Sequence, residues 1–414
     1  MAQIASLSYS SPFYALLQGA LQSAGFKGDI QSFLLDDFWQ TVMPVAKWKQ
    51  FYSLGNENTT GEVRQYFGTN RVPVMASYTS ENAEGHLIAN KGFSVTQKEM
   101  PTASLSYKYD NDSFRKGQEL MDALAVDMSG AYANIFQSFV EDTSSLIQGF
   151  DSLRSYTGLQ VESTGKYIAD ATNNPGGIQG IMFDFTEHAP NFTQNEKLTG
   201  HFAEEDTAYT IQGKTYPWSN ANSSPIGDLM DMAHAYKYIK HGDLRSAVFR
   251  MSDTTANIFY NNANVKREVR LNMQGADADP TNLDAIRVSE ADVNAYLTKL
   301  GLPTIEVEDL RSAVQVLNPE TKLLEEQLLC GFADDVVLLR PKGVFGHYDW
   351  QRVSNLAATN INPLFYAENS LIGIQQLTNT AGGEIRFNGK SKGIPVPDNI
   401  NMFLYLDIAT EQTT

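Results

Sequence analysis

Cysteine is almost absent from this sequence. Cys330 is the one cysteine among 414 residues, so the chain cannot form an internal disulfide bond. Secreted proteins that depend on disulfide bonds for stability are therefore excluded, and synthesis in a reducing cytosol fits the composition. Zinc sites built from Cys-x-x-Cys pairs are excluded for the same reason.

Positive charge is also scarce. Lys and Arg total 31 against 48 Asp and Glu, which gives a formal net charge of −17. A surface of this sign repels polyanions, so we expect neither broad electrostatic binding of nucleic acid nor attachment to an anionic membrane surface.

Long apolar runs are missing. No segment approaches the ~18 consecutive apolar residues of a membrane-spanning helix. The early apolar residues are interrupted by Ser, Gln and Gly, so we expect no signal peptide. Because 42% of the residues are nevertheless hydrophobic, the chain can bury a large core, and its length predicts two or three compact units.

The sequence motifs of common enzymes are lacking too. There is no His-Glu-x-x-His, no Gly-x-x-x-x-Gly-Lys-Ser/Thr loop and no Gly-x-Ser-x-Gly elbow. His234 and His241 are seven residues apart, too far for the i, i+4 pair of a helical metal site. Asp334 and Asp335 precede a strand, where neighbours point to opposite faces, and Ser252 is better interpreted as a helix cap than as a nucleophile. We therefore predict no catalytic residue, no metal site and no cofactor.

What the sequence does contain is a long helical segment. No proline occurs between Pro101 and Pro175, and apolar residues recur at steps of three and four within residues 111–169. They are Met121, Leu124, Met128, Tyr132, Ile135, Phe139, Leu146, Phe150 and Leu153. Gly130 and Gly149 each cost a helix up to ~1 kcal/mol relative to Ala, so a kink or break is allowed. By itself the segment is most simply interpreted as the core helix of an enzyme, and the flanking segments change that interpretation.

Two segments before this helix have apolar patches and little local sequence to bury them. Residues 1–50 read as an arm that packs on the main body or reaches another subunit. Residues 71–110 read as two extended arms, Val72–Ala76 outward and Ala103–Tyr109 back, joined by turns. A two-stranded arm is marginal in water, so a neighbouring subunit is its natural support. Lys91 lies at the predicted tip of these arms. It is either an ordinary surface lysine, a contact between subunits or the site of a covalent link.

The remaining chain predicts short strands and capped helices, with Trp218 as an anchor. One helix starts at Ser224-Pro225 and ends at His241-Gly242, and another has Ser289 as its cap, Asp292 three residues on and Gly301 at its end. The predicted strands are Ile181–Phe185, a strand ending at Met251, residues 301–309, residues 334–343, Leu371–Gln375, Glu384–Phe387 and Met402–Ile408, with Pro363, Pro395 and Pro397 in the connections.

Several segments carry a resemblance to a known family. They are VPVMASYTSENAEGHLIANKGFSVTQKEMPTASLSYKYD, STGKYIADATNNPGGIQGIMFDF, YPWSNANSSPIGDLMDM, FRMSDTTANIFYNNANV, VNAYLTKLGLPTIEVED and DDVVLLRPKGVFG. Their order and spacing from Val72 to Gly346 resemble the lambda-type major head protein family, which has the Hong Kong 97 fold of tailed-phage capsid proteins. Residues 1–50, 186–217 and 263–287 have no counterpart in that pattern.

The resemblance implies an α+β fold with four parts. These are an N-terminal arm (1–50), an extended β-loop (71–110), a peripheral domain with a long spine helix (111–221 and 346–414) and an axial domain (222–345). Its implied inter-subunit contact residues are Phe13, Phe38, Trp39, Glu84, Gly85, Lys91 and Phe93.

The resemblance also implies a structural role without catalysis. The chain would assemble with itself into pentamers and hexamers of an icosahedral virion capsid in the host cytoplasm. Portal, scaffolding and cementing proteins would be its partners, packaged double-stranded DNA would be touched only weakly, and no membrane would be involved. An encapsulin-like nanocompartment shell protein is the alternative with the same fold, and a cytosolic α/β hydrolase is the alternative of another class.

Overall fold

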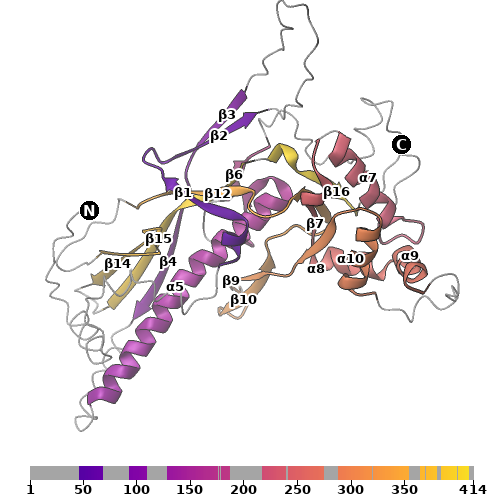
Figure 1. The fold of residues 1–414 in the computed structure, drawn as a ribbon. Coiled ribbons are helices and arrows are strands. Elements are labelled where there is room, and N and C mark those ends of the chain that lie inside the picture. The colour runs from indigo at the N-terminus through magenta and orange to yellow at the C-terminus, as the bar shows by residue number, and fades with distance from the viewer. Residues whose placement is uncertain are drawn as a thin grey trace, which may run out of the picture. The chain divides into compact units, whose positions relative to one another are not determined.

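The computed structural model describes residues 46–68, 93–109, 128–175, 177, 179–186, 217–238, 241–274, 288–318, 320–353, 364–368, 370–379, 384–398 and 400–409. The chain divides into two compact units. The first takes Met1–Val63, Glu99–Ser155 and Tyr348–Pro395, and the second takes Arg64–Lys98, Tyr156–His347 and Val396–Thr414. Both units mix helices and strands (Figure 1), so the predicted mixture of helices and strands is confirmed.

A six-stranded sheet forms the first unit. Its strands follow the order β1 (Tyr52–Glu57), β12 (Gly346–Gln351), β15 (Glu384–Pro397), β14 (Ile372–Asn379) and β13 (Leu364–Ala367), and β4 (Thr102–Tyr109) also pairs with β15. Both β14 and β4 run antiparallel to the same half of β15. Since a strand has two edges, β15 lies between them and is the central strand of the sheet.

Helix α5 (Met128–Thr164) is the longest helix in the part of the chain that the structure describes, with 37 residues. Leu146 and Phe150 are buried, and Gly389 of β15 lets them approach the sheet. A Cβ atom at position 389 would lie 2.7 Å from Leu146 Cδ2 and 2.9 Å from Phe150 Cε2. Gly149 likewise lets α5 approach β4, because a Cβ atom at position 149 would lie 2.7 Å from Leu105 Cδ2. These two glycines allow close contact between helix and sheet.

The predicted long helix is confirmed in type and continues through both Gly130 and Gly149 without a break. It ends at Thr164, before the segment GKYIADATNN that was expected to follow the helix. Gly165 adopts a φ of +71°, a left-handed conformation that glycine allows at little cost. The chain therefore leaves the helix there and continues as β5 (Lys166–Ala169), which pairs with β6 (Gly180–Asp184).

A four-stranded sheet and four helices form the core of the second unit. The sheet order is β16 (Leu404–Asp407), β11 (Val336–Pro341), β7 (Ala247–Ser252) and β8 (Thr304–Glu308). The helices are α7 (Pro225–Tyr238), α8 (Asp253–Asn261), α9 (Ala263–Gln274) and α10 (Glu290–Lys299). Every residue of β7 is buried, as expected for a strand with neighbours on both edges and covered faces. One continuous cluster, with Trp218, Leu229, Phe259, Val269, Leu297 and Leu339 among its members, fills the core.

The predicted helix signals at Ser252, Ser289 and Gly301 are confirmed. Ser252 caps α8 by accepting the Thr255 N–H at 3.2 Å. Ser289 and Asp292 form a reciprocal capping box at the start of α10. Gly301 follows that helix with a φ of +74°. These local signals depend on a few neighbouring residues only, which is why the sequence reveals them.

The predicted strand Ala103–Tyr109 is found as β4, and its observed partner was not predicted. The outward arm at residues 72–76, along which we expected it to return, lies outside the described residues. β4 pairs along its whole length with β15, from Thr102 opposite Lys392 to Tyr109 opposite Ile385. The paired strands of the excursion are β2 (Glu62–Gly68) and β3 (Phe93–Glu99), a separate two-stranded sheet. Pro101, which lacks an N–H to continue the ladder, separates β3 from β4.

Other differences concern the C-terminal half. Pro395 and Pro397 lie within β15 and not in connections. Residues two apart direct their N–H groups to the same edge of a strand, so both missing donors fall on one edge. The hairpin of β9 (Arg311–Leu317) and β10 (Leu324–Cys330) was not predicted. Residues 396–414 belong to the second unit, where β16 pairs with β11.

Candidate functional site

Most of the predicted inter-subunit contact residues lie outside the described part of the chain. These are Phe13, Phe38, Trp39, Glu84, Gly85 and Lys91, and their role stays a prediction. Phe93 is the first residue of β3. The described end of the predicted N-terminal arm belongs to the first unit, because Trp48 is 2% exposed and its Nε1 donates to Asp151 Oδ1 at 2.9 Å.

The first unit contains a buried arginine, Arg154. Arg154 of α5 donates to Asp151 Oδ1 at 3.1 Å, to Glu368 Oε2 at 2.5 Å and to Ser391 Oγ at 3.0 Å. Its guanidinium also lies over the ring of Tyr348, 5.3 Å from the centroid. These contacts attach α5 to β12, to β15 and to the turn that follows β13.

The two carboxylates of this cluster differ in pKa. Burial and the nearby charge of Glu368 raise the pKa of Asp151, outweighing its cationic neighbours. Burial also opposes ionisation of Glu368, but Arg154 and Lys49 outweigh it and lower the pKa of that group. Glu368 is therefore the carboxylate that balances the buried guanidinium. Its salt bridge with Lys49 measures 2.7 Å.

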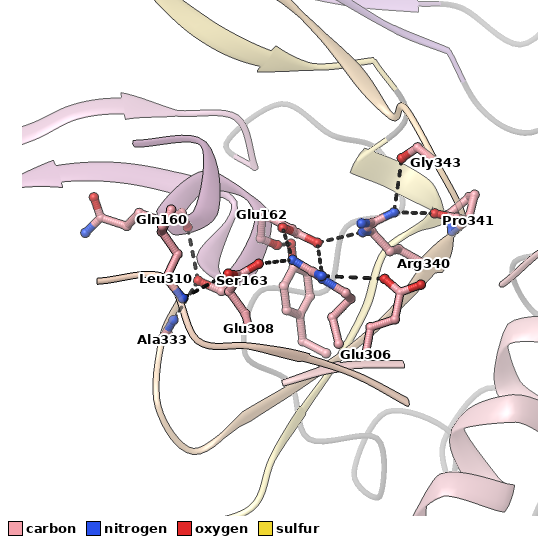
Figure 2. Close-up of polar contacts among 12 residues, drawn as sticks. Gln160, Glu162, Ser163, Glu306, Glu308, Leu310, Ala333, Arg340, Pro341 and Gly343 are labelled. Atoms are coloured by element: carbon pink, nitrogen blue, oxygen red, sulfur yellow. Dashed lines mark hydrogen bonds and ion pairs between the residues drawn. The ribbon is translucent and has the colours of Figure 1, made fainter. Parts of the chain in front are cut away.

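A second and larger charged cluster lies inside the second unit, around Glu162 near the end of α5 (Figure 2). The Glu162 side chain is fully buried. Its Oε1 accepts from Arg250 Nε at 3.1 Å and from Arg340 Nε at 2.6 Å. Arg250 Nη2 in turn donates to Glu308 Oε2 at 2.7 Å. Two arginines from β7 and β11 thus meet two glutamates from α5 and β8, and their charges balance.

Further hydrogen bonds complete the cluster. Arg340 Nη1 donates to the carbonyl oxygens of Pro341 at 2.6 Å and Gly343 at 3.3 Å. The Tyr405 hydroxyl donates to the backbone oxygen of Glu162 at 2.9 Å. Burial alone would raise the pKa of Glu162, but the charges of Arg250 and Arg340 outweigh burial and lower it. The carboxylate is held ionised by guanidinium groups and is not a free base for catalysis.

Both clusters were missed in the sequence, although a signal for the second was present. Arg250 interrupts the apolar strand AVFRMS, and Arg340 ends the apolar run VVLLR. A charged residue in a run that must be buried requires an opposite charge. The sequence does not show which carboxylate pairs with these arginines, because Glu162 is 88 residues from Arg250 and 178 from Arg340.

The remaining candidate groups have structural roles. The Ser252 hydroxyl donates to Asp334 Oδ1 at 2.6 Å while its oxygen caps α8, so the cap interpretation is confirmed. Asp335 has a φ of +60° and forms the turn before β11. No three or more His, Cys, Asp or Glu residues within the described ranges could together hold a metal ion. Nor is any helix there long and apolar enough to cross a membrane.

No protein-family model matches the chain, and no curated protein matches it. The solved structures that match include phage capsid proteins. One, described as a capsid protein of an E. coli CFT073 prophage, has 13% identity and a TM-score of 0.42, and the match covers 97% of this chain and 99% of that one. The mature capsid of bacteriophage PhiM1 has 10% identity and a TM-score of 0.40, with coverage of 92% and 90%.

A virus-like particle from Pyrococcus furiosus also matches, with 8% identity, a TM-score of 0.35 and coverage of 96% of this chain and 100% of that one. The similarity to phage capsid proteins that the sequence indicates is therefore found among solved structures.

One carboxyl group in the second unit has a strongly raised pKa. Asp228 of α7 accepts the Trp218 indole N–H at 2.7 Å. Burial raises the pKa of Asp228 to about 6, the Trp218 hydrogen bond opposes the rise, and the nearby Asp231 adds to it. The ionised form of Asp228 is therefore less favourable in the folded chain than in the unfolded chain.

Replacing the central carboxylate of the second cluster tests its role. Glu162→Gln leaves two buried guanidinium groups with one glutamate, so we expect the free energy of unfolding to fall by about 3–5 kcal/mol. Glu306→Gln is the matched control, because Glu306 also contacts Arg250, at 3.5 Å, but is 48% exposed. An exposed pair contributes about 1 kcal/mol or less. Chemical denaturation of the dissociated subunits measures both, and equal effects would contradict the assigned role.

The raised pKa of Asp228 predicts a pH-dependent effect. Between its ordinary value of 3.8 and about 6, the folded chain binds the proton more tightly than the unfolded chain, so stability falls as pH rises. Asp228→Asn removes this loss of stability, and its amide oxygen can still accept the hydrogen bond from Trp218. We expect its stability relative to the wild type to be greater at pH 7 than at pH 4, by about 1–3 kcal/mol. Denaturation at both pH values measures this. Asp309→Asn serves as the control for losing an exposed carboxylate, and a difference independent of pH for Asp228→Asn would refute the prediction.

Proposed function

We propose that this chain is the major capsid protein of a tailed phage, a structural protein that assembles with itself into the pentamers and hexamers of an icosahedral head around double-stranded DNA. The order of its parts carries the proposal. A two-stranded ribbon is followed by a sheet strand, by the 37-residue helix α5, by a second α/β unit, and by strands that return to the first sheet. This order agrees with the segments that resemble the lambda-type major head proteins.

The ribbon of β2 and β3 gives a physical reason for self-association. Its two strands pair only with each other among the strands that the structure describes. A two-stranded sheet by itself is marginally stable in water. Residues 69–92 connect these strands, and they contain the predicted contact residues Glu84, Gly85 and Lys91. In the proposed shell, the part of the extended β-loop at residues 69–92 gains its stability from a neighbouring copy.

The chemistry of the described residues agrees with a structural role. Glu162, Arg250, Arg340 and Glu308 neutralise one another inside the second unit, and Ser252 serves as a helix cap. We assign the first unit to the peripheral position of a capsid subunit and the second to the axial position. Portal, scaffolding and cementing proteins are the further partners of this proposal. The negative charge of the chain keeps its contact with packaged DNA weak.

Electron microscopy tests the proposal directly. Negative staining of the purified protein at high concentration should reveal closed rounded or polygonal particles. A strictly monomeric protein would overturn the proposal and favour the hydrolase alternative. Flanking genes for terminase, portal and tail proteins distinguish a phage head from a nanocompartment shell, since these genes accompany only the former.

Shortening the extended loop tests its role in assembly. Replacing residues 70–91 with a short Gly/Ser linker keeps β2 and β3 joined and removes the predicted tip. We expect a soluble subunit with an unchanged melting temperature that no longer closes into shells, as judged by sedimentation and microscopy. Shortening the β9–β10 turn (residues 318–323) with Asn-Gly is the control. Normal shells from the loop variant would show that the loop is not required.

A further inference from the structure

Strand β4 stops pairing with β15 at a proline. The last pair of their ladder is Thr102 opposite Lys392, and beyond it the Gly393 N–H donates to the Pro101 carbonyl at 3.2 Å. The preceding strand, β3, pairs with β2 alone among the strands that the structure describes. Strand β15 itself continues to Pro397. Both β3 and β15 are thus extended beyond this point, yet they do not pair with each other.

The direction of the N–H groups explains why the ladder ends here. Residues two apart along a strand direct their N–H groups to the same edge. Since Gly393 donates to Pro101, the edge of β15 that faces β4 should next receive donors from positions 395 and 397. Both positions are prolines. Pro101 in turn has no N–H to return to Gly393. The ladder therefore lacks a donor at Pro101, Pro395 and Pro397 in succession.

Extending the observed register shows which pairs are prevented. The ladder between β4 and β15 would place Glu99 of β3 opposite Pro395, and Gln97 opposite Pro397. In an antiparallel sheet, residues paired in this way exchange a hydrogen bond in each direction. A proline leaves a bond in one direction only, which is why proline is confined to strands without a partner on that side.

The other edge of β15 keeps its donors. Lys392, Ile394 and Val396 direct their N–H groups to that edge by the same alternation. Asp398 continues the series, and its N–H donates to the Phe345 carbonyl at 3.0 Å, directly before β12. Strand β12 pairs with β15. The prolines therefore affect a single edge of β15 and leave the rest of the sheet intact.

The ribbon of β2 and β3 has a free edge as a result. The Met100 N–H donates to the carbonyl of Gly61, the residue before β2, at 2.9 Å. By alternation Lys98 also directs its N–H toward β2, and Glu99 and Gln97 direct theirs away from it. An edge of this kind pairs readily with another strand that comes near it. The strand nearest along the chain is β15, through β4.

We propose that Pro101, Pro395 and Pro397 together prevent β3 from pairing with β15 of its own chain, and so keep the free edge of the ribbon available. The inference rests on the proposed function, in which a neighbouring copy stabilises the extended loop. It adds how a subunit avoids pairing its own loop before assembly. The prolines make the internal pairing poor in hydrogen bonds, whereas a strand without prolines would complete it.

Restoring the donors of β15 tests this role. Pro395→Val with Pro397→Val supplies both N–H groups, and valine has as many side-chain carbon atoms as proline and favours strands. This match matters because both prolines are buried. We expect the amide hydrogens of Glu99 and Gln97 to exchange about tenfold more slowly than in the wild type, because hydrogen-bonded amides are protected. Hydrogen exchange of the dissociated subunits measures this.

The same variant should assemble less readily. Only subunits with a free ribbon are competent in the proposed assembly, so a tenfold smaller competent fraction raises the required protein concentration about tenfold. Light scattering and particle counts in the microscope measure that concentration. The melting temperature of the dissociated subunit should not fall, because the restored N–H groups find acceptors on β3.

Two further variants serve as controls. Adding Gln97→Pro to the valine pair removes a donor from the free edge of β3 and spares the edge that faces β2. It should return the exchange of Glu99 and the assembly concentration toward wild-type values. Ile394→Val with Val396→Ile changes neighbouring buried side chains and no backbone donor, and should behave as the wild type does.

The outcomes separate the inference from the function it rests on. If Glu99 and Gln97 exchange as fast in the valine variant as in the wild type, the prolines do not keep the strands apart and the inference is wrong. If exchange slows but assembly is unchanged, the free edge is not needed and the inference is likewise wrong, while the proposed function stands. If the wild type forms no shells, the proposed function fails. Should the double variant not fold, Pro395→Val alone, judged by the exchange of Glu99, decides.

Discussion

The second unit depends on a buried carboxylate that two arginines share. Glu162 accepts hydrogen bonds from Arg250 and Arg340, whose strands β7 and β11 are neighbours in the central sheet. Removing two guanidinium groups from water is costly, and the cost is recovered only if each finds a charge and a full set of hydrogen bonds. Glu162 and Glu308 supply the charges, and the carbonyl oxygens of Pro341 and Gly343 supply acceptors. The end of α5 is therefore confined to one position against this sheet.

A buried charge specifies geometry more strictly than an apolar contact does. A leucine at position 162 could pack in several orientations, whereas a helix rotated by one residue, about 100°, would leave two buried arginines without their partner. Arg154 imposes the same constraint in the first unit, through Asp151, Glu368 and Ser391. Both residues lie on α5, eight positions apart in the sequence, and each serves the unit to which it belongs. In the proposed shell, every copy of the subunit must present the same surfaces, so a single permitted arrangement is an advantage.

Acidity and the proposed self-association make opposing demands on this chain. A net charge of −17 keeps separate copies apart and limits adhesion to DNA. Assembly then requires surfaces where the charge is absent, or extended segments that gain hydrogen bonds on a neighbour. In the proposed shell, the loop between β2 and β3 is of the second kind.

The sequence by itself determined the features that depend on near neighbours along the chain. Ser252, Ser289 and Gly301 mark helix ends because a cap involves residues within one turn, and α5 is visible because apolar residues repeat at helical spacing. Only the tertiary structure decided which strand pairs with β4 and that Pro395 and Pro397 lie within β15. It also decided that Glu162 is the carboxylate that pairs with Arg250 and Arg340. Strand pairing and buried ion pairs join residues far apart in the chain, and many partners satisfy the same local pattern. The choice among them is made by packing the whole core at once.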